Sequence, residues 1–274
     1  LFHTTFNVLN VLFLVAFVPR IVTLIERYQK EKKGDDSTYR LQYISSGMMS
    51  SPELSISQAH KEIQLFGKLI EKIHYSFEAL LFNKQGKQSK FLKKIKEREN
   101  ITDTIELEVA EYLTKISSTN LTESSTRRIR GMHSIINDLE RVADIYYQMS
   151  KTFEQMQSEG TDFKEPVLIR LKEMLNLILE DIQLVRNNLK KDYGTVDLDD
   201  AIEVEGYIDA YRDELLEFHY SQLENKAYSN KAGFIFLDYV NRMEKIGDHL
   251  FNVNEAMAGI KVKAAYEKVI EERG

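Results

Sequence analysis

The feature that most constrains the fold is an acidic motif that recurs along the chain at nearly constant offsets. Each copy has a glutamate followed four residues later by an aspartate, and the four copies are Glu99–Asp103, Glu140–Asp144, Glu205–Asp209 and Glu244–Asp248. The third copy follows the first by 106 residues, and the fourth follows the second by 104. Because 43 of the 274 residues are acidic, one isolated pair would carry no weight. The recurrence predicts an internal repeat of one structural unit.

The pattern from residue 52 to Gly259 is helical almost throughout. The whole chain has only 12 glycines and 3 prolines, and 29% of its residues are charged, which suits long amphipathic helices with solvated outer faces. Turn-forming residues interrupt the pattern at five places: 84–88, 117–121, 158–162, 193–199 and 227–230. The breaks leave six helices of roughly 25–35 residues, a length typical of bundles. We predict an all-α fold made of a tandem pair of antiparallel three-helix bundles.

Two helix starts carry capping residues. Ser51 is a predicted N-cap, and Pro52 suits the first helical position. Asp162 and Glu165 have the spacing of a capping box, which predicts a helix start at Asp162.

The first 25 residues differ from the rest because they carry a single formal charge, at Arg20. The apolar run from Phe6 to Val18 is too short to cross a bilayer alone. We expect the end of a transmembrane helix whose span either begins before Leu1 or continues to Ile25. Basic residues follow as far as Lys33 and predict a cytoplasmic location for what comes next. The alternative is a buried helix of a soluble protein.

These observations divide the chain into five predicted segments. They are the end of a transmembrane helix with its juxtamembrane residues (1–27), a linker (28–51), the first three-helix repeat (52–158), the second repeat (159–258) and a tail (259–274).

Composition and motifs exclude several functions. The net charge of −6 leaves no basic surplus for a nucleic-acid partner. With no cysteine, a metal site must use oxygen or imidazole ligands. No P-loop, dinucleotide fingerprint or nucleophile elbow occurs, and no histidine follows the glutamate of an acidic motif at i+3, as in di-metal bundle enzymes. We therefore expect no enzyme.

The acidic motifs predict cation binding. A glutamate and an aspartate four residues apart share one helix face and repel each other, and a cation between them reverses the sign of the interaction. Asn137 and Asn241 each precede a motif glutamate by three residues, and the small residues Ala143 and Gly247 allow close helix approach. The candidate ligands are Glu99, Asp103, Asn137, Glu140, Asp144, Glu205, Asp209, Asn241, Glu244 and Asp248.

Two further interpretations stay open. The acids could pair with lysine or arginine at the bundle edges, with Arg141, Arg242 and Lys245 as candidates. His249 directly follows Asp248 and so points about 100° away from it. We interpret it as a surface histidine or as a support for a ligand.

The motifs Glu140-Arg-Val-Ala-Asp144 and Glu244-Lys-Ile-Gly-Asp248 resemble those of the PhoU family, and the upstream motifs match as well. The resemblance implies a fold of two three-helix repeats, acid pairs that bind multinuclear metal clusters, and regulation of phosphate uptake. Lys245 departs from the family pattern, in which arginine is commoner at that position.

Two more segments are similar to bacterial sodium/phosphate cotransporters with a C-terminal PhoU-like domain: His3-Thr-Thr-Phe6-Asn7-Val-Leu-Asn, and Ser51-Pro-Glu-Leu-Ser-Ile-Ser-Gln-Ala-His-Lys-Glu62. This resemblance implies a domain of an inner-membrane transporter, cytoplasmic after about residue 27. The expected partners are the transport domain of the same polypeptide, a second copy of the chain and phosphate-signalling proteins. The expected cofactors are divalent or trivalent ions (Mg, Mn, Zn or Fe). The competing hypothesis is a metal-free helical scaffold for dimerisation or docking.

Overall fold

The computed structural model describes residue 6 and residues 41–44, 51–83, 86–225 and 227–261, and these residues form helices and no strands. The six long helices are α2 (Pro52–Phe82), α3 (Gln88–Ser117), α4 (Glu123–Ser158), α5 (Glu165–Asn188), α6 (Asp199–Glu224) and α7 (Asn230–Ala258). The all-α prediction is confirmed for the described residues, and each connection between consecutive helices overlaps a predicted break, although α5 ends at Asn188, before the break predicted at 193–199.

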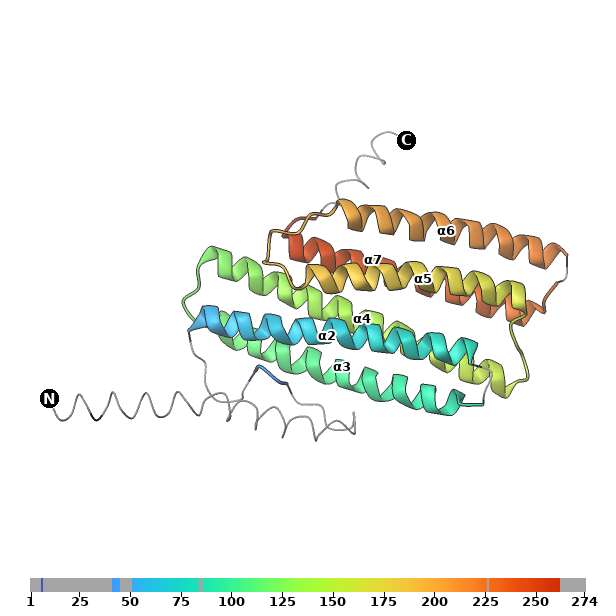
Figure 1. Cartoon of the computed structure of the whole chain (residues 1–274), viewed down its shortest axis with the longest axis horizontal. Coiled ribbons are helices and arrows are strands. Elements are labelled where there is room, and N and C mark those ends of the chain that lie inside the picture. The colour runs from blue at the N-terminus through green and yellow to red at the C-terminus, as the bar shows by residue number, and fades with distance from the viewer. Residues whose placement is uncertain (1–5, 7–40, 45–50, 84–85, 226, 262–274) are drawn as a thin grey trace. The chain divides into compact units, whose positions relative to one another are not determined.

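The helices pack in two groups of three (Figure 1). Helices α2, α3 and α4 all contact one another, as do α5, α6 and α7. The groups meet where α4 packs on α7 and α2 packs on α5, whereas α3 and α6 do not touch. Consecutive helices run antiparallel (Figure 1). Residues 41–261 belong to one compact unit, so the division at residues 158 and 159 stays a prediction.

Buried side chains of both groups meet in the core. Tyr146 of α4 and Tyr239 of α7 are fully buried, and both rings contact the ring of Phe77 of α2. The hydroxyl of Tyr239 donates to the backbone carbonyl of Met149, 2.9 Å away on α4. His74 Nδ1 lies 2.7 Å from the Tyr146 hydroxyl, and burial lowers the pKa of His74 to about 4. The centre of the molecule therefore joins the two groups.

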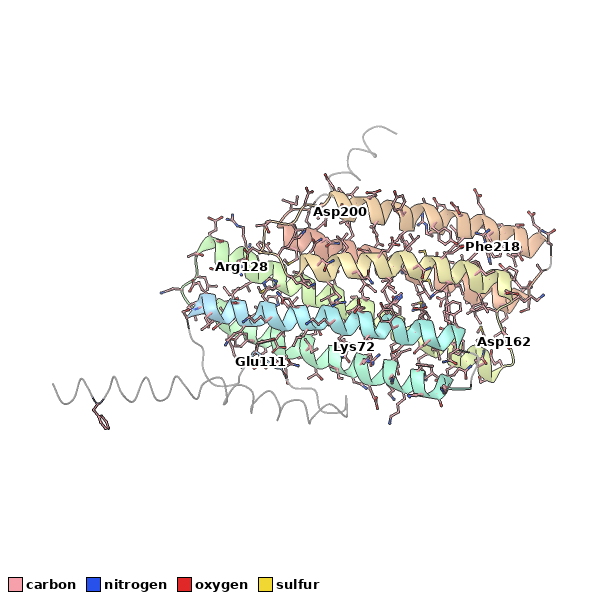
Figure 2. All side chains as sticks on the ribbon, in the orientation of Figure 1. Lys72, Glu111, Arg128, Asp162, Asp200 and Phe218 are labelled. Atoms are coloured by element: carbon pink, nitrogen blue, oxygen red, sulfur yellow. The ribbon has the colours of Figure 1, made fainter. Side chains whose placement is uncertain are left out.

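The helix starts agree with the sequence in one case and differ in the other. Helix α2 has Ser51 at its N-cap and Pro52 in its first turn, although the Ser51 side chain makes no capping bond. The prediction of a start at Asp162 is wrong, because α5 begins at Glu165. Asp162 lies in the α4–α5 connection (Figure 2) and accepts a bond of 2.5 Å from Gln157. Since Pro166 has no N–H, it could not bond to the Asp162 carbonyl in a helix that began there.

No helix within the described ranges is both long and apolar enough to cross a bilayer. The predicted transmembrane segment, 1–27, lies outside the described residues apart from Phe6. The same holds for residues 28–40 and 45–50 of the linker and 262–274 of the tail.

Candidate functional site

The motifs Glu99–Asp103 of α3 and Glu140–Asp144 of α4 form what we call the first acidic site. Helices α3 and α4 pack along each other, and the charges of Glu140 and Asp144 act on Glu99, so the two motifs lie close together. Asp103 is exposed and the other three side chains are half-buried. The site is thus open to solvent while part of its charge is withdrawn from water.

Repulsion within the first acidic site shows in its pKa values. Burial raises the pKa of Glu99 to about 7, and the charges of Asp103, Asp144 and Glu140 add to the effect, against a smaller opposing effect of Lys96. Burial also raises the pKa of Asp103, with help from Asp144. Carboxylates that raise one another's pKa lack enough positive charge nearby.

A fifth carboxylate, on Glu106 of α3, belongs to the same surface. Burial raises the pKa of Glu140, and Glu106, Asp144 and Asp103 raise it further while Arg141 opposes them. The Arg141 Nε atom lies 3.8 Å from the Glu140 carboxylate, which is a loose ion pair between neighbours in sequence. The hypothesis that Arg141 neutralises this site therefore accounts for only part of its charge.

Asp144 is linked to the other helix group through Gln148. The Gln148 side-chain amide donates to Asp144 Oδ2 at 2.8 Å, and its carbonyl oxygen accepts a bond of 2.5 Å from Arg242 of α7. Arg242 also donates to Asp238 at 2.8 Å. The sequence suggests Arg242 as a basic partner of the acidic motifs. In the structure the Gln148 side chain lies between Arg242 and the motif residue Asp144.

Glu205 and Asp209 of α6 and Glu244 and Asp248 of α7 form the second acidic site, on the other helix group. The helices approach closely at Gly247, where an added Cβ would lie 3.2 Å from Ile208 and 3.5 Å from a carboxylate oxygen of Glu205. The small residue that the motif supplies therefore makes room for the opposing motif.

The arginine of the second acidic site, Arg212, lies on the helix opposite the glutamate that it contacts, whereas Arg141 in the first site is the sequence neighbour of Glu140. Arg212 of α6 places Nη1 3.5 Å from Glu244 Oε1 and donates from Nη2 to Asp213 at 2.8 Å. Burial lowers the pKa of Arg212, but Asp213, Glu244 and Asp209 outweigh it and leave the pKa raised. Arg212 lies three residues after Asp209, and this i, i+3 spacing could have revealed it in the sequence.

Asp181 of α5 is a further acid near the second acidic site, and the sequence did not predict it. It is almost completely buried, and burial together with the charge of Glu205 holds its pKa well above the usual range. Asp181 belongs to no repeated motif, so no pattern in the sequence separates it from the other acids.

The remaining candidates lie beside these sites. Asn137 and Asn241 are exposed, and Asn137 lines a hollow of about 440 Å³ together with Arg130 and Tyr193. His249 lies 2.9 Å from Asp138 of α4, so it connects the two helix groups.

The donors present decide how well the arrangement suits a metal ion. Across the described residues, no three histidine, aspartate or glutamate side chains stand together in a way that could hold an ion. The first acidic site nevertheless fits a hard cation by its oxygen donors and excess negative charge. Its half-exposed side chains can rotate, so the fit is one of charge and chemistry rather than of preformed geometry.

Residues 63–153 match the family model described as the PhoU domain. The chain contains a PhoU domain. The matched segment includes both motifs of the first acidic site, so the resemblance of this segment to the PhoU family is confirmed. No curated protein sequence matches the chain.

Solved structures of PhoU proteins share the fold. PhoU from Pseudomonas aeruginosa is 17% identical, with a TM-score of 0.66 over 75% of this chain and 96% of that one. The phosphate transport system regulatory protein PhoU from Streptococcus pneumoniae is 16% identical, with a TM-score of 0.63 over 76% of this chain and 95% of that one. The similarity extends over both helix groups, beyond the matched PhoU domain.

Proposed function

We propose that the chain is the cytoplasmic regulatory domain of a sodium-dependent phosphate transporter of the bacterial inner membrane, and that it acts by binding metal ions. The observation that carries the proposal is that the PhoU domain, 63–153, includes an acidic site with too little positive charge of its own. The similar protein from S. pneumoniae is a phosphate transport system regulatory protein, which supports the same role. The role is regulatory rather than catalytic.

The first acidic site is the proposed cation site. Its carboxylates come from two neighbouring helices and repel one another, so they weaken the packing of α3 on α4 when no cation is bound. A bound Mg²⁺, Mn²⁺, Zn²⁺ or iron ion would supply the missing positive charge. The carboxylates would then hold the two helices together instead of pushing them apart.

A route for regulation leads from Asp144 to the other helix group. Asp144 accepts the bond from Gln148, and Gln148 in turn accepts the bond from Arg242. An Asp144 oxygen that turned toward a cation would give up the Gln148 amide and leave Arg242 with a changed partner on α7. The proposed receiver of this change is the membrane transport domain of the same polypeptide.

Metal-dependent melting tests the proposal. In the full chain purified without chelator, we expect one of these ions at about 100-fold above its dissociation constant to add about 2.7 kcal/mol to the free energy of unfolding, because it binds only the folded state. For a chain of this size that corresponds to a rise in Tm of roughly 5 to 10 °C. The double variant Glu140→Gln, Asp144→Asn should lose most of the rise.

Glu214→Gln with Glu217→Gln is the matched control, since it removes two exposed carboxylates of α6 outside both acidic sites. This control should keep the full rise in Tm. An unchanged Tm with every ion, together with no metal in the purified protein, would exclude the cation-binding part of the proposal.

The second candidate is a metal-free scaffold for dimerisation or docking. Two observations favour it: the described residues contain no preformed metal site, and Phe234 is 74% exposed beside a hollow of about 370 Å³. Phe234→Ser separates the candidates. The scaffold predicts that this substitution disrupts self-association in sedimentation and that no metal ion changes the Tm. The regulatory proposal predicts that a metal ion raises the Tm of this variant as much as that of the unchanged chain.

A further inference from the structure

We infer that the second acidic site does not take up the cation, because Arg212 already provides its positive charge. The inference rests on the proposed function of the first acidic site. It differs from the expectation of the sequence analysis, in which all four motifs are metal sites. The two sites carry opposite charges at one corresponding position beside the motifs, and that reversal supports the inference.

Burial shows that the motif spacing also aligns the rest of helices α3 and α6. At the offset of 106 residues that separates Glu99 from Glu205, each buried position of α6 falls on a buried position of α3. The pairs are Ile95 with Ala201, Thr102 with Ile208, Val109 with Leu215 and Leu113 with His219. Equal burial at four positions over five turns means that the two helices present corresponding faces.

At this offset Arg212 corresponds to Glu106. Both side chains are half-buried and both follow the motif aspartate by three residues. In the first site the Glu106 charge adds to the repulsion on Glu140. In the second site the Arg212 guanidinium lies beside Glu244, the counterpart of Glu140 at the offset of 104. One corresponding position therefore carries opposite charges in the two acidic sites.

A guanidinium in that position closes the second site to metal ions. It stays charged at any physiological pH, so its repulsion of a metal cation does not depend on pH. Arg212 contacts Glu244, and the charge of Asp209 also acts on it, so the arginine engages one residue from each of the two motifs. A metal ion at these carboxylates would have to displace Arg212 and break its bond to Asp213.

The two acidic sites therefore respond differently to metal ions. The contacts between α3 and α4 change with the metal concentration, whereas the second acidic site keeps Arg212 as its counter-ion at every metal concentration.

Charge reversal at Glu106 and at Arg212 tests the inference that Arg212 excludes metal ions from the second acidic site. The measurements are calorimetric titration of the full chain with Mn²⁺ and the metal content of the purified protein. Arg212→Glu should about double the Mn²⁺ bound per chain, because each helix group then has five carboxylates facing one surface. Glu106→Arg should abolish binding to the otherwise unchanged chain. A chain that carries both substitutions should bind Mn²⁺ at the second site only.

Two control variants separate charge from folding. Arg212→Lys keeps the positive charge and should leave Mn²⁺ binding as in the unchanged chain. Arg130→Glu makes the same charge reversal at an exposed position of α4 outside both sites and should not add bound Mn²⁺. Helical circular dichroism of each variant in Mn²⁺ shows whether it is folded.

The outcomes distinguish the inference from the proposed function. If Glu244→Gln with Asp248→Asn lowers Mn²⁺ binding to the unchanged chain as much as Glu140→Gln with Asp144→Asn does, the inference is wrong while the proposed function stands. If the unchanged chain binds no Mn²⁺ but Arg212→Glu does, the proposed function fails and the role of Arg212 is upheld. If neither binds Mn²⁺, both are wrong.

Discussion

Because its pKa is raised, Glu99 makes the free energy of unfolding depend on pH. Its pKa is about 7 in the folded chain, against 4.5 as the ordinary value, because of burial and of the charges of Asp103, Asp144 and Glu140. Between these two pH values the folded state binds more protons than the unfolded state. Glu99 therefore contributes a fall in the free energy of unfolding as the pH rises from about 4.5 to about 7, whereas His74, whose pKa burial lowers to about 4, contributes a rise up to about pH 6.5.

We predict that Glu99→Gln removes the Glu99 contribution to the pH dependence. The substitution removes the titrating group and leaves a side chain of the same shape, so the variant should gain stability relative to the unchanged chain as the pH rises. Urea denaturation in the presence of a chelator, at several values across this window, measures the effect. Glu214→Gln serves as the control. Parallel pH profiles for the unchanged chain and Glu99→Gln would show that Glu99 ionises normally.

The sequence identified the acids of the two sites but not the residues that distinguish them. The recurring motifs gave Glu99 and Glu205 as equivalent positions, and the structure places both beside the opposing motif of their own helix pair. Gln148 was missed because its importance depends on Arg242, which lies on another helix 94 residues away. Arg212 was missed although its spacing from the motif aspartate was visible, because the predicted basic partners all belong to the helices of the second and fourth motifs.

For the helices, the sequence was most informative where glycine and proline set the ends. Gly259 has a φ of 73° and ends α7 in the left-handed conformation, close to the predicted boundary. The predicted start at Asp162 is wrong because Pro166, directly after the capping pattern, has no N–H to bond to the Asp162 carbonyl. Close packing was predictable at Gly247, which belongs to a repeated motif, but not at Gly131, whose neighbour Tyr193 lies in the connection between α5 and α6.

Two glycine-to-alanine substitutions should change stability in opposite directions. A Cβ at Gly131 of α4 would come within 2.5 Å of the Tyr193 ring, which also lies against Gly259. Gly131→Ala should therefore cost about 1 to 3 kcal/mol of unfolding free energy. A Cβ at Gly206 of α6 would meet nothing within 4 Å, so Gly206→Ala should add about 1 kcal/mol through helix propensity. Urea denaturation of both variants measures the difference. Equal effects would mean that Tyr193 moves aside freely.

Across the whole molecule, the two helix groups are joined by polar contacts as well as by the core. His249 of α7 pairs with Asp138 of α4, and Arg186 of α5 pairs with Glu71 of α2. The Gln64 side chain also donates to the Leu189 carbonyl at 3.0 Å. These contacts lie at both seams, α4 with α7 and α2 with α5. A chain joined in this way should unfold in one step rather than group by group.

Hydrogen exchange tests two things at once: whether the two helix groups unfold cooperatively, and whether the chain binds a cation. The proposed cation site lies on α3 and α4, and α6 touches neither of them. If the groups unfold together, Mn²⁺ should slow the exchange of the most protected amides of α6 by the same factor as those of α3, because both exchange only through global unfolding. The factor is about 100 when Mn²⁺ is at 100-fold its dissociation constant. Glu140→Gln with Asp144→Asn should remove the slowing from both helices. Slower exchange in α3 alone would show that the second helix group opens independently and cannot receive the change that the cation makes in the first.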